Sequence, residues 1–296
     1  MAKVEIDEVT GRETTGHEWD GIKELNNPMP KWWVWVFWVS IVFSIGYWVF
    51  NPSFPLGRTY IGGLFGPDAR LNVQASLDEA NAAKAEFTDQ IASVDITELP
   101  GNEDLMQYAT HGGEVYFQDN CVPCHGLGGA GQGFYPTLAD DDWIWGGTID
   151  EIAYTIRHGI RNDQSDESRY SEMPRYGVDG ILEREQIEQV ASYILSINQQ
   201  DREFDAAMAE EGQVIYEEQC AACHGEEGKG DIYAGAPNLT DAIWLYGGEY
   251  EQIVQQIWQP RQGVMPAFGQ RLSDTEIKML ASYVYNLGGG QESLPE

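Results

Sequence analysis

An uninterrupted apolar run from Trp32 to Phe50 is the first strong pattern along the chain. It contains no charged residue and is followed directly by Asn51 and Pro52. As a helix, its 19 residues reach about 28 Å, close to the roughly 30 Å of a bilayer core. Tryptophan and tyrosine, which favour membrane–water interfaces, stand near both ends. The run therefore predicts a membrane helix over residues 32–50, preceded by a polar segment over residues 1–31.

Two other interpretations of this run are a buried helix of a soluble domain and a cleaved signal peptide. The signal peptide fits worse, because a long polar stretch precedes the run and no small-residue cleavage site follows it. Residues 51–103 read as an interfacial segment and linker. Its first part is rich in proline, glycine and aromatic residues, and Leu77–Ile91 has the composition of a helical connector.

Beyond residue 103, apolar positions recur every three to four residues, as in Asp150–His158 and Arg184–Ile197. No stretch of useful length alternates with a period of two. The predicted fold class is therefore all-α.

An internal repeat fills this helical part of the chain. Five segments of the first copy recur in the same order in the second: Gly113–Gly126 and Gly212–Gly225, Pro136–Leu138 and Pro237–Leu239, Trp143–Gly147 and Trp244–Gly248, Met173-Pro174 and Met265-Pro266, and Ile187–Tyr193 and Ile277–Tyr283. Shared order over this many segments indicates duplication. We therefore expect two tandem domains, over residues 104–200 and 201–296.

The charge balance narrows the classes of function. The chain has 17 Lys and Arg against 48 Asp and Glu, a net charge of −31. This excludes nucleic acid as a partner, because binding a duplex needs a cationic face that displaces counterions. A hydrophobic content of 42% is too high for a disordered acidic tail. Four cysteines are too few for a disulfide-built scaffold, so their placement decides their role.

All four cysteines fall in two Cys-x-x-Cys-His motifs, one in each copy. Two thiols three residues apart lie on one side of a helical turn, where each can add to one vinyl group of the same porphyrin. The histidine that follows is then placed to face the iron. The motifs predict two covalently bound haem c groups, attached at Cys121, Cys124, Cys220 and Cys223, with His125 and His224 as iron ligands.

Three other uses of these cysteines are a zinc site, a redox-active thiol pair and structural disulfides. A zinc site would need a short loop between the pairs, whereas Cys124 and Cys220 are 96 positions apart. A thioredoxin-like pair needs a βαβ context, which the pattern lacks. A disulfide within either motif would close a strained four-residue ring.

A methionine opposite the histidine suits an iron that carries electrons. Met173 and Met265 occupy matching places in the repeat, and the proline after each takes it out of helix. We expect Met173 to be the second ligand of the first haem and Met265 that of the second. The rival candidates are His158 and Met106 for the first haem, and Met279 and Met208 for the second.

These motifs resemble the class I c-type cytochromes. The segment Gly16–Trp33 together with the membrane helix resembles the membrane-anchored di-haem subunit (subunit III) of cbb3-type cytochrome c oxidase. The resemblance implies that the carbonyls of Pro136 and Pro237 orient the two proximal imidazoles. It also implies a close crossing of first and last helices in each copy, with Gly113 and Phe117, and Gly212 and Tyr216, against Tyr193 and Tyr283.

One departure from the repeat lies before the first methionine. Gly147 and Met173 are 26 positions apart, but Gly248 and Met265 only 17, so the first copy has nine extra residues. They fall near residues 161–170, where the charged and polar composition predicts a surface loop.

The resemblance implies an electron-transfer subunit of a terminal oxidase, with no oxygen-reducing centre on this chain itself. The implied partners are a membrane-embedded catalytic subunit, a mono-haem cytochrome c subunit, a donor cytochrome c and the lipid bilayer. The implied location is a bacterial inner membrane, with the N-terminus in the cytoplasm and both haem domains in the periplasm. Two alternatives stay open: a membrane-anchored di-haem carrier outside any oxidase, and a di-haem peroxidase.

Overall fold

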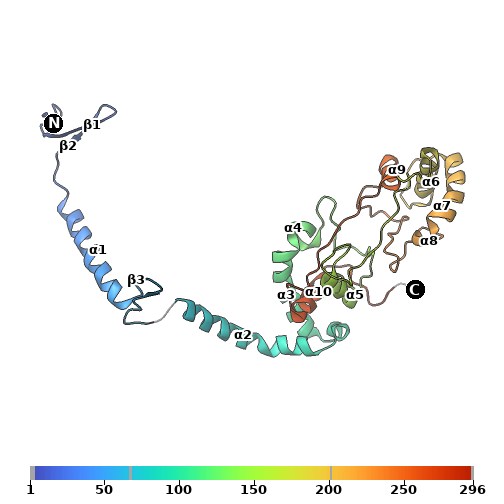
Figure 1. The fold of residues 1–296 in the computed structure, drawn as a ribbon, viewed down its shortest axis with the longest axis horizontal. Helices are drawn as coiled ribbons and strands as arrows, with labels where there is room; N and C mark the ends of the chain where they lie inside the picture. Colours follow the sequence, from blue (N-terminus) through green and yellow to red (C-terminus); the bar gives the residue numbers. More distant parts are fainter. Residues whose placement is uncertain (1–3, 67–68, 201, 295–296) are drawn as a thin grey trace. The chain divides into compact units, whose positions relative to one another are not determined.

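The computed structural model describes residues 4–66, 69–200 and 202–294. It divides into two units, with the boundary between Ala83 and Lys84, and each unit is described by itself. Figure 1 traces the helices of both. The described residues are mostly helical, which confirms the predicted all-α class.

The first unit begins with a small hairpin that the sequence patterns did not predict. Strand β1 (Thr14–Trp19) pairs antiparallel with β2 (Ile22–Leu25). Asp20 and Gly21 form the turn with φ angles of 49° and 81°. Both residues have positive φ, as in the two-residue turns that Asp-Gly favours. The Asp-Gly pair was therefore the local signal for this hairpin.

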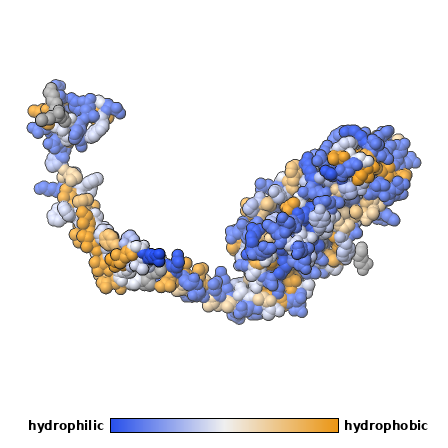
Figure 2. Space-filling model, viewed as in Figure 1, coloured by the Kyte–Doolittle hydropathy of each residue, from blue (hydrophilic) through white to orange (hydrophobic). Residues whose placement is uncertain are grey.

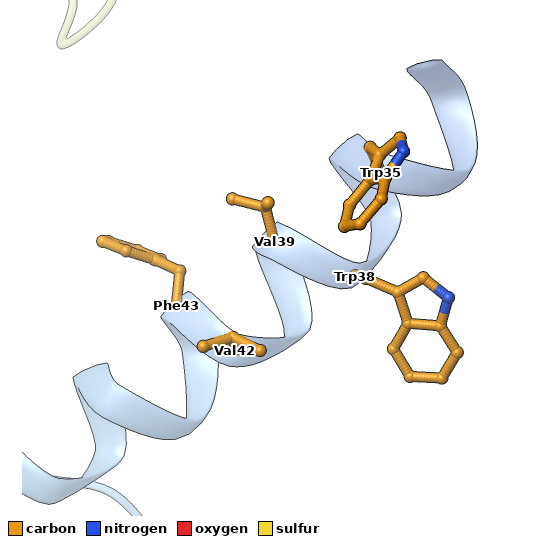
Figure 3. Close-up of a pocket in the computed structure, with 5 residues that line it drawn as sticks. All are labelled: Trp35, Trp38, Val39, Val42 and Phe43. Carbon is orange, nitrogen blue, oxygen red and sulfur yellow. The ribbon is translucent and has the colours of Figure 1, made fainter. Parts of the chain in front are cut away.

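Helix α1 (Lys31–Phe50) coincides with the predicted membrane helix and extends it by one residue. It is long and apolar enough to cross a membrane, and none of its residues is buried in the protein. Figure 2 shows a largely hydrophobic surface along it. In Figure 3, Trp35, Val39 and Phe43 follow one another at four-residue spacing along one side of the helix, where they border a shallow groove with Trp38 and Val42. Such side chains suit contact with lipid or with another membrane helix.

The chain folds back on itself after α1. Strands β3 (Pro55–Leu56) and β4 (Thr59–Tyr60) form a second short hairpin. The amides of Leu64 and Phe65 then donate to the carbonyls of Val49 and Phe50, 3.0 and 2.9 Å away. These bonds satisfy carbonyls that the end of α1 leaves open. The connector helix α2 (Ala69–Ser93) follows, longer than predicted, and contains the boundary between the units.

The second unit holds the repeat. It contains the end of α2, a 3₁₀ turn η1 (Ile96–Gly101), a second turn η2 (Leu127–Gly129), and the helices α3 (Glu103–Asn120), α4 (Val122–His125), α5 (Ile149–His158), α6 (Arg184–Ile197), α7 (Ala206–Gln219), α8 (Ala221–His224), α9 (Tyr250–Trp258) and α10 (Asp274–Tyr285). Lys278 of α10 fixes the end of α2 here, since its Nζ donates to the carbonyls of Ile91, Ala92 and Val94. A cation at these last carbonyls also complements the helix dipole.

The helices pack between the copies rather than within them. Helix α10 of the second copy lies against α3 and α5 of the first, and α6 of the first copy lies against α7 and α9 of the second (Figure 1). The expectation that each copy packs its first helix on its own last helix was therefore wrong. Residues 198–205 join α6 to α7, and helices joined by a short connection pack as antiparallel neighbours. Since α6 packs on α7, the last helix of the chain, α10, packs on α3 instead.

Each crossing is built on a glycine. A Cβ added to Gly113 would lie 2.0 Å from the Met279 carbonyl oxygen, and one added to Gly212 would lie 2.0 Å from that of Gln189. Aromatic pairs flank the crossings, with ring centroids 5.1 Å apart in both Phe117–Tyr283 and Tyr193–Tyr216. The glycines and aromatics named from the sequence thus lie at helix crossings, but with their partners exchanged.

The exchange produces two hydrophobic cores of mixed origin. The first contains Cys121 and residues of α3 and α5 together with Ile277, Leu280 and Val284 of α10. The second contains Cys220 and residues of α7 and α9 together with Ile187, Val190 and Ile194 of α6. The packed cores and the sequence repeats are therefore different divisions of the chain.

Alanine at Gly113 will lower stability, because its methyl group must displace the backbone of α10. We expect Gly113→Ala and Gly212→Ala each to reduce the free energy of unfolding by about 1–3 kcal/mol. Gly112→Ala is the matched control, since its Cβ meets only the flexible end of Met279, with the nearest atom 3.0 Å away. Thermal unfolding of the purified full-length protein measures all three. A Gly113→Ala protein as stable as Gly112→Ala would contradict the close crossing.

Candidate functional site

The two cysteine motifs form single helical turns, α4 and α8, that directly follow α3 and α7. In the first turn, the amides of Cys124 and His125 donate to the Cys121 carbonyl at 3.1 and 2.8 Å. The second turn repeats these bonds at Cys220. Cys121 and Cys220 are buried, while Cys124 is half-buried and Cys223 exposed. All four thiols are free, so each turn offers two thiols to one group.

The histidines that follow the two cysteine pairs are held in one orientation by backbone carbonyls. Nδ1 of His125 lies 3.0 Å from the Pro136 carbonyl oxygen, and Nδ1 of His224 lies 3.0 Å from that of Pro237. A proton on Nδ1 makes this bond and leaves the Nε2 lone pair for a metal. Burial lowers the pKa of both imidazoles, and the carbonyl contacts oppose this effect. Both rings are therefore suited to the neutral form that binds iron.

The structure pairs the methionines and cysteines across the copies. Met265 packs against the core that contains Cys121, and Met173 packs against the core that contains Cys220. The packing therefore favours a pairing opposite to the expected one of Met173 with the first motif and Met265 with the second. The helix exchange is the physical reason, since each methionine segment leads into the last helix of its copy. That these sulfurs bind iron stays a prediction.

The rival ligands have other contacts. Met106 and Met279 are buried among the apolar side chains of the first core. His158 has Nδ1 2.9 Å from the Ser165 hydroxyl and Nε2 3.3 Å from a Glu167 carboxylate oxygen. Met208 lies in the first turn of α7. Cys121 and Cys220 belong to separate cores, which disfavours one tetrahedral zinc site shared by the two cysteine pairs.

Two aromatic residues join the copies, and the sequence analysis gave them no role. A Cβ added to Gly235 would lie only 2.2 Å from the Trp145 ring, so this ring packs directly on Gly235. The ring centroids of Tyr246 and Phe134 are 5.9 Å apart. In the repeat, Trp145 corresponds to Tyr246 and Phe134 corresponds to Gly235. Each aromatic therefore reaches into the loop after the other copy's cysteine motif. The sequence could have indicated this role, because Trp145 and Tyr246 are aromatic residues at the same position of the two repeats.

Carboxylates from both copies also face one another. Burial, together with the charges of Asp241, Asp140 and Asp141, raises the pKa of Asp142 to about 6. Burial likewise raises the pKa of Asp140 and Asp241. These aspartates repel one another when ionised, which opposes the contact between the copies.

Asp142→Asn will stabilise the protein at neutral pH. A carboxyl whose folded-state pKa lies above its unfolded value of 3.8 is stabilising below that value, and its contribution is lost as pH rises through about 6. Because the group is partly solvated, we expect a gain of only about 1 kcal/mol at pH 7.5 and little change at pH 4. Urea unfolding at both pH values measures this. Asp166→Asn, which removes an exposed carboxylate, is the control, and an equal gain from both would contradict the effect of the cluster.

The arrangement fits a haem c group at each turn. Each site has two free thiols, one oriented imidazole and a methionine on the same core. These are the donors that a covalently attached, six-coordinate haem requires.

Comparison with known proteins covers nearly the whole chain. Residues 11–58 match the N-terminal domain of cytochrome oxidase-cbb3, FixP; residues 109–198 match cytochrome c; and residues 207–284 match cytochrome c oxidase, cbb3-type, subunit III. The chain is 49% identical to the cbb3-type cytochrome c oxidase subunit CcoP of Cereibacter sphaeroides, over 94% of this chain and 95% of that protein.

Other relatives agree. The CcoP subunit of Azospirillum brasilense is 48% identical over 98% of this chain and all of its own length. The FixP subunit of Azorhizobium caulinodans is 46% identical over 97% of this chain and 96% of its own. A membrane helix, two cytochrome c domains and these relatives together identify the chain as a member of the CcoP/FixP family of cbb3-type cytochrome c oxidase subunits, which transfer electrons through haem c.

Proposed function

We propose that the chain carries two haem c groups whose ligands are exchanged between the copies. The first is attached at Cys121 and Cys124 and bound by His125 and Met265. The second is attached at Cys220 and Cys223 and bound by His224 and Met173. The observation that carries this pairing is the packing of each methionine against the core of the other copy's cysteine motif.

The chain's residues act by holding each haem rather than by reacting. When bound, haem supplies an iron that gains and loses one electron. His125 and His224 are fixed by the carbonyls of Pro136 and Pro237 and so keep one orientation. A methionine sulfur as the other ligand would close the iron to small molecules and raise its reduction potential. With His125 and Met265, and His224 and Met173, as ligands, neither site would have the open position that a peroxidase needs, and oxygen reduction would take place on another subunit.

The anchor and the charge support a place in a membrane oxidase. We propose that α1 holds the chain in a bacterial inner membrane, with residues 1–31 in the cytoplasm and the haem domains in the periplasm. Electrons pass from a donor cytochrome c through both haems to a membrane-embedded catalytic subunit, beside a mono-haem cytochrome c subunit. The net charge of −31 favours a basic donor and predicts a rate that falls as salt rises. The match of residues 11–58 to an oxidase-specific domain favours this assembly over a free di-haem carrier.

Exchanging each methionine for histidine tests the proposed ligands. A second imidazole stabilises the ferric iron, so Met265→His should lower the potential of the first haem, and Met173→His that of the second, by on the order of 100 mV. Redox titration followed by absorbance measures both potentials.

Removing one thiol distinguishes the two haems. In Cys121→Ala the first haem keeps one vinyl group, which moves its absorption band to longer wavelength and marks it. In the marked protein, Met265→His should lower the potential of the shifted band, and Met173→His that of the unshifted band. The reverse result would show that each copy supplies both ligands of its own haem.

Purification from a mild detergent tests the assembly. A tagged chain should bring down an oxidase that contains copper and further haem, and that consumes oxygen when a reduced cytochrome c is added. A chain without residues 1–50 is the control, since it keeps both haem domains but lacks α1 and the oxidase-specific segment. Recovery of the full chain alone, with its haem intact, would favour the free carrier.

A further inference from the structure

The insertion of the first copy directly contacts residues 263–270, here called the Met265 segment. We propose that residues 161–170, here called the strap, hold this segment in place, with Asn162 and Gln164 as positioning residues for the sulfur ligand of the first haem. This inference rests on the proposed role of Met265 as that ligand.

The Met265 backbone is anchored at both of its polar groups. Its amide donates to the Ile160 carbonyl at 3.0 Å, and its carbonyl accepts from the Ile160 amide at 2.9 Å. The neighbouring Gly159 has a φ of 70°, and a Cβ there would lie 2.4 Å from the Met265 carbonyl oxygen. The end of α5 and the methionine segment are therefore in close backbone contact.

Asn162 of the strap adds a side-chain donor to the same carbonyl. Its Nδ2 lies 3.0 Å from the Met265 oxygen, 3.0 Å from the His158 oxygen and 2.9 Å from the Ser168 hydroxyl. Its Oδ1 accepts from the Gln164 amide at 3.0 Å. Both ends of the carboxamide are therefore used, and neither an aspartate nor an alanine can replace it.

Two further residues of the strap form hydrogen bonds to the Met265 segment. Gln164 Oε1 accepts from the Ala267 amide at 3.1 Å, and the Gln164 carbonyl accepts from Gln270 Nε2 at 2.8 Å. Arg161 Nε donates to the Gly263 carbonyl at 2.7 Å. The strap thus contacts the backbone of the segment before, at and after Met265.

The strap is itself fastened to α5. The Arg161 amide donates to the Arg169 carbonyl at 2.8 Å. The Arg169 guanidinium forms an ion pair with Glu151, donates to the Thr155 hydroxyl at 2.8 Å and lies 4.7 Å from the Tyr154 ring centroid. The strap therefore connects a helix of the first core to the methionine segment as a fixed bridge.

The other methionine segment is held differently. The residue that corresponds to Ile160 in the second copy is Arg261, whose amide donates to Gln256 Oε1 at 3.2 Å rather than to the Met173 carbonyl. Instead, Gln262 Nε2 donates to the Met173 carbonyl at 3.1 Å. The second copy also lacks the nine extra residues that fall within the strap region. The first haem should therefore keep its sulfur ligand more firmly than the second.

Competition with imidazole on the ferric full-length protein tests this inference. The Met173→His background leaves only the first haem with a sulfur ligand that imidazole can displace. There, Asn162→Ala and Asn162→Asp should each increase the apparent affinity for imidazole about three- to tenfold, the factor expected for one lost hydrogen bond. Loss of the near-infrared methionine-to-iron band follows the displacement. Gln164→Ala should act in the same direction.

The controls separate a local effect from a general one. Asp163→Ala truncates an exposed neighbour in the strap and should leave the affinity unchanged. In a Met265→His background, Asn162→Ala should not affect displacement of Met173, whereas Gln262→Ala should promote it. Thermal unfolding is measured in parallel, and a uniform loss of stability without a change in imidazole affinity would overturn the positioning role.

The measurements distinguish failure of the ligand assignment of Met265 from failure of the positioning role of the strap. If Met265→His leaves the near-infrared band at full intensity, Met265 is not a ligand and the proposed function needs another residue. If that substitution removes half of the band but the Asn162 variants bind imidazole as Asp163→Ala does, the ligand assignment stands and the strap has no positioning role.

Discussion

The close approach of helices at Gly113 and Gly212 is the constraint on which the rest of the second unit depends. Each glycine lets a carbonyl of the partner helix occupy the place of a side chain. The two crossings join α3 to α10 and α6 to α7, so both connect one copy to the other. Because these crossings bring the last helix of each copy to the other copy's cysteine motif, they decide which methionine packs against the core of which motif.

The exchange also couples the two sites mechanically. Each core takes helices from both copies, and Trp145 and Tyr246 reach across in matching positions. Two independent cytochrome domains on a flexible linker would change their separation as the linker moves. Here the shared cores fix the separation of the two cysteine motifs. A fixed separation suits electron transfer, because the transfer rate depends steeply on the distance between donor and acceptor. The repelling aspartates around Asp142 work against this contact, so apolar packing must outweigh them.

Local features of the fold and the site could be predicted from the sequence, whereas long-range pairings could not. The membrane helix follows from an uncharged run of the right length, and the cysteine turns follow from residue types at fixed spacing. Pro136 and Pro237 were named as partners of the histidines and lie at hydrogen-bond distance from them. Their role as parts of a haem site remains a prediction.

The sequence analysis missed the exchange of helices between the copies because the two repeats have the same local pattern. Tyr193 and Tyr283 occupy the same place in two similar segments, so either can pack on Phe117 or Tyr216 without any change in local pattern. The choice depends on the short connection between α6 and α7, whose effect appears only in three dimensions. The hairpin at Asp20-Gly21 was missed for a different reason, since two short strands give a weak periodic signal.

Shared cores have a consequence for how the protein is made. The first thiol pair is synthesised long before Met265 and α10, which complete its surroundings. A nascent chain that ends after α6 therefore holds the first cysteine motif without the helix that completes its core, and both cores are complete only when the polypeptide is nearly finished. For the same reason, cutting the chain between the repeats would not yield two self-contained domains, because each half would lack a helix of its own core.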